Sequence, residues 1–432
     1  MIDKEIRERI IDLMKREVVP AVGCTEPTAV ALCTAVATRL LPEGAVPEHI
    51  EVKASANIIK NAMGVGIPGT GMIGLPIAVA LGALIGDPDD KLEVLQHVNH
   101  EAVERGRKYI EEGRINISLA ADAPSILHID VEVTADGHTA RAVISQSHTN
   151  VVHTELDGKV LSDVASGSQS AAAASTDDDI ELNMRMVHEF ATTSPIEELA
   201  FILEARRLNY AAATYALAGD YGHSLGATML VKGKEIWGDT VLCHMVGMTS
   251  AACDARMGGA PVAVMSNSGS GNQGITATMP VVVFAEESGA SEEQLVRALT
   301  LSHLTSIYIK QSLGRLSALC GCVVASTGAA SGLVYLMGGG YDQTCAAIKN
   351  MVANLAGMIC DGAKPSCSMK ISSGVSTALL SAMLAMNGRC VTGAEGIVSD
   401  DVDASIRNLT GIGREAMTEP DRLVLHIMTH KC

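Results

Sequence analysis

Residues 126–158 read ILHIDVEVTADGHTARAVISQSHTNVVHTELDG. Apolar and polar residues alternate along three segments of this sequence, which is the period of a half-buried β-strand. The turns fall at Asp136-Gly137 and Asp157-Gly158. Asp-Gly between alternating runs is the strongest short-range hairpin signal, because the tight turn requires positive φ angles. The pattern therefore predicts an antiparallel β-meander from 126 to 164.

Helical patterns on both sides of this meander predict an α+β fold. Before it, residues 49–59 alternate like one further strand, and residues 165–179 after it have the small and acidic composition of an exposed connector. We therefore expect an α+β part over 1–165 and a mostly helical part over 180–432. The predicted helices span 4–18, 27–41, 72–85 and 89–112 before the meander, and 180–190, 195–217, 291–310, 316–336, 343–358, 372–386 and 401–410 after it.

The composition excludes several classes of partner. The formal net charge is −17, and the Lys and Arg residues are scattered, whereas nucleic acids and anionic membranes both require a basic patch. Eleven cysteines without a signal-peptide pattern favour free thiols in a reducing cytoplasm over a disulfide framework. Two uncharged stretches, 257–285 and 316–341, contain many Gly, Ser and Thr residues. They predict buried helices of a globular protein rather than membrane spans.

Three cysteines in the last third of the chain form an incomplete set of metal ligands. Cys320 ends RLSALC, and Cys360 and Cys367 form a C-x6-C pair in MICDGAKPSC. Three thiolates can hold a [4Fe-4S] cluster by three of its irons, which leaves the fourth open as a Lewis acid for elimination chemistry. The turn-forming residues around these thiols suit a loop that wraps around a ligand. The alternative is three buried free cysteines, since unpaired Cys is among the most buried residue types.

Cys24 precedes the helix that Pro27 opens, so its thiol is expected at a helix N-terminus. The positive end of the helix dipole favours a thiolate there, although Glu26 opposes ionisation. A thiolate could act as a base, a nucleophile or a metal ligand. The role of Cys322 is left open, and Cys432 could either occupy the open iron when no substrate is bound or be an incidental thiol at a disordered end.

The glycine-rich run Ser266–Gly274 (SNSGSGNQG) offers many backbone N–H groups and side-chain amides in a small space. Such a loop suits an anion, either a phosphate or an amino-acid carboxylate. It lacks the lysine of a Walker A motif, so it gives little support to nucleotide binding. The alternative is an irregular loop between helices.

Several motifs in the same order resemble the L-cysteine desulfidase family, whose members are similar to the alpha chain of iron-sulfur L-serine dehydratases. The resemblance runs from about residue 15 to the C-terminus. The motifs are GCTEP (23–27), KNAMGVGIPGTGMIGLPIA (60–78), HTNVVH (148–153), DARMGGA (254–260), MSNSGSGNQGITATMP (265–280), RLSALC (315–320) and GMICDGAKPSCSMK (357–370).

The resemblance implies a lyase that converts L-cysteine and water to pyruvate, ammonia and hydrogen sulfide without pyridoxal phosphate. It implies that Cys320, Cys360 and Cys367 hold a [4Fe-4S] cluster and that Cys24 acts in acid–base catalysis. The expected partner is a small amino-acid substrate in the cytoplasm, with a homodimer left open. The residues predicted to bind the substrate are Thr25, Asn61, His148, Thr149, Asn150, Ser266, Ser268, Gly269 and Asn272.

Three other functions stay open at this stage. An iron-sulfur L-serine dehydratase would use the same site on a different leaving group. A non-catalytic iron-sulfur sensor would hold the cluster without turnover. A pyridoxal-phosphate lyase would need a Schiff-base lysine such as Lys310 or Lys370, but no lysine is favoured by the sequence.

Overall fold

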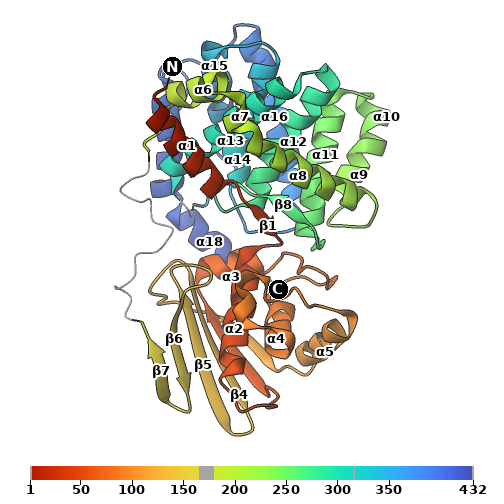
Figure 1. Ribbon diagram of the computed structural model, residues 1–432, viewed down its shortest axis with the longest axis vertical. Helices are drawn as coiled ribbons and strands as arrows, with labels where there is room; N and C mark the ends of the chain where they lie inside the picture. Colours follow the sequence, from red (N-terminus) through yellow and green to blue (C-terminus); the bar gives the residue numbers. More distant parts are fainter. Residues whose placement is uncertain (1, 165–179, 315–316, 431–432) are drawn as a thin grey trace.

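The computed structural model describes residues 2–164, 180–314 and 317–430, and within these ranges the chain forms two parts arranged along its long axis (Figure 1). One part combines helices with a β-sheet, and the other is helical apart from a short strand. The predicted α+β fold class is therefore confirmed. The predicted connector, 165–179, lies outside the described residues.

A six-stranded sheet forms the base of the α+β part, with the strand order β3-β2-β4-β5-β6-β7. The last four strands are the predicted antiparallel meander, while β2 and β3 pair in parallel. Asp136, Gly137, Asp157 and Gly158 all have positive φ angles, as a two-residue hairpin turn requires. The strands are β2 (His49–Ala54), β3 (Ile115–Leu119), β4 (His128–Ala135), β5 (His138–Ser145), β6 (Val151–Leu156) and β7 (Lys159–Asp163).

Helices cover one face of this sheet. Helix α2 packs on β4 and β5, α4 packs on α2, and the buried alternate residues of β4 (Ile129, Val131, Val133) face this layer. The strand predicted over 49–59 ends earlier, because the chain turns into α3 after Ser55. The helix predicted over 89–112 is divided, since the Asn99 side chain caps a separate helix by accepting from the Ala102 N–H. The helices are α2 (Thr25–Arg39), α3 (Ala56–Ala62), α4 (Leu75–Ile85), the 3₁₀ helix η1 (Pro88–Glu93) and α5 (His100–Glu111).

The helical part is built around α14 (Gly321–Leu336), which packs against α12, α13, α15 and α16. Small residues allow this close approach: a Cβ on Gly328 would collide with Ser302 and Ser306 of α13. Helix α11 was not predicted, and α12 was expected only as a buried helix somewhere within 257–285. Both helices are buried almost all round and lack a polar face that would mark their bounds. The remaining helices are α1 (Lys4–Glu17), α6 (Met184–Thr193), α7 (Ile196–Leu199), η2 (Ala200–Ile202), α8 (Leu203–Leu217), α9 (Leu225–Thr228), η3 (Met229–Gly233), α10 (Lys234–Trp237), α11 (Val241–Met257), α12 (Gly271–Ser288), α13 (Glu292–Leu313), α15 (Tyr341–Leu355), α16 (Cys367–Met386), α17 (Val402–Gly411), η4 (Ile412–Ala416) and α18 (Thr418–Thr429).

Both ends of the described chain cross between the two parts (Figure 1). Helix α1 packs its buried residues, Ile10 and Met14, into the helical core, and the chain then enters the α+β part through β1 (Pro20–Val22). Strand β1 pairs antiparallel with β8 (Ala263–Met265) of the helical part. Helix α18 lies beside α3 and packs Leu425 into the core of the α+β part. These crossings hold the two parts against each other.

One helix among the described residues, α16, is long and apolar enough by length and composition to cross a bilayer. Half of its apolar window is buried inside the protein, where α11, α14 and α15 pack on it. A core helix of a globular protein meets the same two criteria.

Candidate functional site

The predicted cysteines lie at the ends of helices that converge where the two parts meet. Cys24 is the N-cap of α2, Cys320 is the N-cap of α14, and Cys367 is the first residue of α16. The N-terminus of α12 joins them, because Gln273 in its first turn packs against Gly321 in the first turn of α14. Each helix N-terminus presents unpaired N–H groups and the positive end of a dipole. A chain with a net charge of −17 therefore contains a locally electropositive site.

A short antiparallel contact brings two of the predicted ligands together. Leu319 and Ile359 form a β-bridge, with the Cys320 N–H donating to Met358 O at 3.0 Å and the Cys360 N–H donating to Ala318 O at 2.7 Å. The thiols of Cys320 and Cys360 then hydrogen-bond to each other. Two residues that are 40 positions apart in the sequence thus become neighbours.

The contact shifts the pKa values of the Cys320 and Cys360 thiols in opposite directions. The hydrogen bond from Cys320 lowers the pKa of Cys360 below the ordinary value, and the positive charges of Lys60 and Lys370 lower it further. The same contact raises the pKa of Cys320, since its thiol is the hydrogen-bond donor. Cys360 is therefore the thiol of this pair that ionises first.

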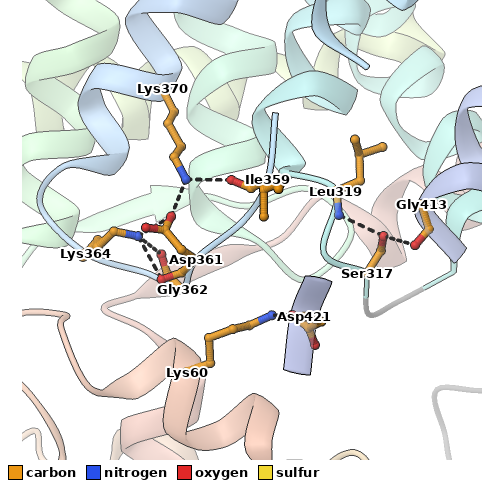
Figure 2. A network of polar contacts seen from close by, with 10 residues as sticks. All are labelled: Lys60, Ser317, Leu319, Ile359, Asp361, Gly362, Lys364, Lys370, Gly413 and Asp421. Carbon is orange, nitrogen blue, oxygen red and sulfur yellow. Dashed lines mark hydrogen bonds and ion pairs between the residues drawn. The ribbon is translucent and has the colours of Figure 1, made fainter. Parts of the chain in front are cut away.

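Lysines surround the loop between Cys360 and Cys367 (Figure 2). Lys364 Nζ donates to Asp361 O at 2.9 Å and to Gly362 O at 3.1 Å, while Lys370 Nζ donates to Ile359 O at 2.7 Å. Both lysines also pair with the Asp361 carboxylate. Burial alone would raise the pKa of Asp361, but these two partners lower it to about 2. The loop is thus fixed by its own charged residues.

Helix α3 of the α+β part closes over the same loop. Gly362 has a φ angle of +89°, and a Cβ there would collide with the Lys60 carbonyl oxygen. The side chain of Lys60, 3% exposed, pairs with Asp421 of α18 (Figure 2). A buried lysine thereby links α3, the cysteine loop and the last helix.

The three predicted ligands match an iron-sulfur cluster in their donor chemistry. Cys367 lies close enough to Cys360 for the two thiols to interact electrostatically, and its Sγ donates to Gly362 O at 3.6 Å. Lys60, Lys364 and Lys370 would stabilise thiolates in this position. Over the ranges 2–164, 180–314 and 317–430, however, no three His, Cys, Asp or Glu side chains are grouped as a single metal ion requires. The residue types and their surroundings therefore fit the cluster.

Cys24 is also buried, at 2% exposed. Burial raises the pKa of its thiol to about 11, although Arg256 acts in the opposite direction. The helix N-terminus was expected to favour the thiolate and Glu26 to oppose it; burial adds a larger effect that favours the neutral thiol. Its electrostatic interaction with Cys367 places it next to the predicted ligand set.

The loop at Ser266–Ser270 leads into α12, which begins at Gly271. Ser266 donates to Val19 O from its N–H at 2.8 Å and from its Oγ at 2.7 Å, and the Ser268 N–H donates to Glu17 O at 2.9 Å. Ser268 and Gly269 both have positive φ angles. Two of the predicted substrate-binding residues, Ser266 and Ser268, thus join this loop to the segment that leads to Cys24.

Asn272, a predicted substrate-binding residue, is joined to Cys24 through Arg256. Its Oδ1 accepts from Arg256 Nη1 at 3.1 Å, and Arg256 in turn acts on the Cys24 thiol. Its Nδ2 donates to Met257 Sδ at 3.4 Å. Asn272 is therefore held on α11 and faces the same region as Cys24.

The other predicted substrate-binding residues make different contacts. Thr149 and Asn150 are exposed in the β5–β6 turn, next to His148, and Asn150 Nδ2 donates back to Ser145 O at 3.0 Å. Thr25 Oγ1 donates to Glu26, and Asn61 is half-buried on α3 next to Lys60. In the described part of the chain, no hydrogen bond or ion pair joins Thr25, Asn61, Thr149 or Asn150 to the three cysteines. Their roles stay predictions.

Sequence reasoning missed the basic residues of the site, above all Arg256 and Lys60. Both are buried, at 7% and 3% exposed. Asp254 and Arg256 are the only Asp, Glu, Lys or Arg residues in the otherwise uncharged α11, and that isolated pair could have drawn attention to Arg256. By contrast, an open surface cavity of about 880 Å³ beside α8 contains none of the predicted site residues in its lining.

Comparison with known proteins identifies the family. A model of the serine dehydratase alpha chain matches residues 89–426, a range that includes Cys320, Cys360 and Cys367. The chain belongs to the serine dehydratase alpha chain family. The family is associated with iron-sulfur-dependent enzymes of the lyase or dehydratase type, which agrees with the donor set described above.

Three bacterial relatives extend this likeness beyond the range matched by the serine dehydratase alpha chain model. A UPF0597 protein of Bacteroides thetaiotaomicron is 60% identical over 434 residues, covering 100% of this chain and 99% of the relative. The UPF0597 protein of Porphyromonas gingivalis is 53% identical over 434 residues, with 99% and 100% covered. That of Chromobacterium violaceum is 45% identical over 434 residues, with 100% of both chains covered. The names of these relatives specify no substrate.

Proposed function

We propose that this protein is an iron-sulfur lyase that converts L-cysteine and water to pyruvate, ammonia and hydrogen sulfide. The observation that carries the proposal is the contact between the Cys320 and Cys360 thiols, with Cys367 and three lysines around them. Cys320, Cys360 and Cys367 would hold a [4Fe-4S] cluster. Such a cluster, held by three cysteines, supplies a Lewis-acidic iron for a soft sulfur leaving group.

The remaining chemistry falls to the chain's own residues. Elimination removes the Cα proton and releases the β-sulfur, so a base is needed beside the bound amino acid. Cys24 is the proposed base: its sulfur accepts the proton as a thiolate, and Arg256 and the α2 N-terminus stabilise that form. Because burial holds the pKa of this thiol near 11, only a small fraction is ionised at neutral pH. A desolvated thiolate is correspondingly basic.

The substrate's polar groups would be held by the predicted binding residues. Asn272, which already accepts from Arg256, is linked to Cys24 through that side chain. His148, Thr149, Asn150 and Asn61 belong to the α+β part, so they would reach the substrate only from that side of the site. After elimination, aminoacrylate tautomerises and hydrolyses in water, which releases pyruvate and ammonia.

The remaining predictions belong to the same proposal. We propose a cytoplasmic enzyme with a small amino-acid substrate and without a nucleic-acid or membrane partner. Residues 1–165 and 180–432 would form its two units, although α1 and α18 each pack across the division. The net charge of −17 supports the proposal that the protein has no nucleic-acid partner.

L-Serine dehydration is the second candidate function, because the family model is that of the serine dehydratase alpha chain. The two candidates differ only in the leaving group. Protein purified without oxygen should be assayed with each amino acid for pyruvate, and with L-cysteine for sulfide. The proposal requires a higher kcat/KM for L-cysteine than for L-serine. The reverse order would make the protein a serine dehydratase, and pyruvate from neither would exclude both.

A further inference from the structure

Arg256 is a buried cation without an acidic partner. It lies near the end of α11 and is 7% exposed. Within the described residues, no carboxylate lies at ion-pair distance from its guanidinium group, and its Nε has no hydrogen-bond partner. Burying a charge without a partner is costly, so such groups are normally paired. Packing alone therefore does not explain why this charge is buried without an acidic partner.

The surroundings of Arg256 fix its orientation. Its Nη1 donates to Asn272 Oδ1 at 3.1 Å, which anchors one edge of the planar group. The guanidinium lies over the first residue of α12, because a Cβ on Gly271 would collide with its Nε and would lie 2.9 Å from its Cζ. The unpartnered Nε belongs to the other edge, which is the edge that pairs with a carboxylate in a two-pronged contact.

The neighbours of Arg256 add positive potential on that side. The N-terminus of α12 lies under the guanidinium, and Cys24, the N-cap of α2, interacts with it. Asp254, the nearest acid along α11, instead accepts from the Gly226 N–H at 2.9 Å. An anionic ligand would thus meet a cation and two helix N-termini, whereas a cationic ligand would be repelled.

We infer that Arg256 binds the α-carboxylate of the amino-acid substrate. This inference rests on the proposed function, in that it takes an α-amino acid as the substrate. Because Arg256 also interacts with the Cys24 thiol, a carboxylate on the unpartnered edge of its guanidinium would bring the adjoining Cα toward the proposed base. Arg256 would then set the position of the substrate, while Cys24 moves the proton.

Binding of two small probes, measured by calorimetry on the anaerobically purified full-length protein, tests this role without turnover. L-Alanine keeps the carboxylate and amine of an amino acid but has no leaving group, and cysteamine is L-cysteine without its carboxylate. Arg256→Gln should weaken L-alanine binding roughly 10- to 100-fold, the usual effect of losing a charge-assisted contact, and leave cysteamine binding unchanged. Arg256→Lys, which keeps the charge without the fork, should weaken L-alanine binding by about 10-fold.

Two further variants keep the test decisive. Gly271→Ala displaces the guanidinium but retains its charge, so it should weaken L-alanine selectively even if Arg256→Gln does not fold. Arg206→Gln removes an exposed guanidinium, paired with Glu286 on another face, and should change neither affinity.

The inference is overturned if both Arg256→Gln and Gly271→Ala bind L-alanine as tightly as the wild type. It is also overturned if cysteamine weakens equally, or if the wild type does not bind L-alanine. Wild-type protein that binds L-alanine through Arg256 but releases no sulfide from L-cysteine contradicts the proposed reaction alone.

Discussion

The cysteine loop around Cys360 and the start of α2 at Cys24 shift the pKa of a thiol in opposite directions. Cys360 has its pKa lowered by the Cys320 hydrogen bond and by Lys60 and Lys370. Cys24 has its pKa raised to about 11, because burial outweighs Arg256. Cys24 caps a helix and Cys360 does not. Hydrogen bonding and nearby lysines thus favour the thiolate at Cys360, whereas desolvation favours the neutral thiol at Cys24.

This contrast divides the site into a side that favours metal ligation and a side that favours proton transfer. Thiolates are the form that binds metal, so the lysine-rich loop suits ligands. A thiol that ionises only with difficulty is a strong base once ionised, which suits Cα–H removal. Each side can be tested separately.

The largest expected effect is the loss of the cluster. Cys320→Ala, Cys360→Ala and Cys367→Ala should each remove the iron and the visible absorbance, because each takes away one thiolate ligand. Iron content and spectra of anaerobically purified protein are the measurements. Cys390→Ala is the matched control and should keep both, since its thiol contacts the Ala346 and Val391 carbonyls instead. Full iron content in two of the three ligand variants would refute the assignment.

The next effect concerns Cys24. Cys24→Ala should retain the iron and lose about 10²- to 10⁴-fold in kcat, the range for removal of a general base. Loss of iron from Cys24→Ala would contradict the contrast between the two sides of the site, because Cys24 would then be a ligand like Cys320, Cys360 and Cys367.

The third effect is a rise in kcat of about tenfold per pH unit. A base whose pKa lies near 11 is mostly protonated at neutral pH, so its active fraction grows as the pH rises toward that value. We expect kcat for L-cysteine to increase with a slope near one on a logarithmic plot between about pH 7 and 9. The kcat of Cys24→Ala provides the baseline. A flat wild-type profile over this interval would contradict a buried thiol as the base.

The smallest effect lies in the scaffold beneath the glycine-rich loop. His303 is fully buried; it bonds to Thr278 at 3.0 Å and to Asn267 at 3.1 Å, and burial lowers its pKa to about 3. Between that value and about 6.5 the unfolded chain binds a proton that the native protein does not. Unfolding free energy should therefore fall on acidification through this interval, by up to about 1.4 kcal/mol per pH unit. Denaturant titrations of the wild type and of His303→Gln should show the wild type with the steeper fall, and equal slopes would exclude His303 as the cause.

Much of the fold follows from local patterns. The meander was predicted from its Asp-Gly turns and alternation, and α1 and α13 from clear helical signals. Helix α11 and the bounds of α12 escaped prediction because residues buried on all sides leave no polar face to mark the helical period. The early end of β2 also escaped, because the alternation over 49–59 continues past Ser55, whereas α3 begins at Ala56 and packs against α2 and α18, which are distant in the sequence.

The site was predictable in its thiols but not in its charges. Cys320, Cys360 and Cys367 are marked by spacing and turn-forming neighbours, which are local features. Lys60 and Arg256 become part of the site only when α3 and α11 meet the cysteine loop and α2. The raised pKa of Cys24 likewise depends on burial, which the sequence around it does not display.

The most direct test of the central claim is product formation by anaerobically purified protein that contains iron. Incubated with L-cysteine, it should release sulfide and pyruvate in equal amounts, and removal of the iron by a chelator should abolish both. Sulfide release that continues undiminished after the iron has been removed would contradict the account, as would the absence of both products from iron-loaded protein.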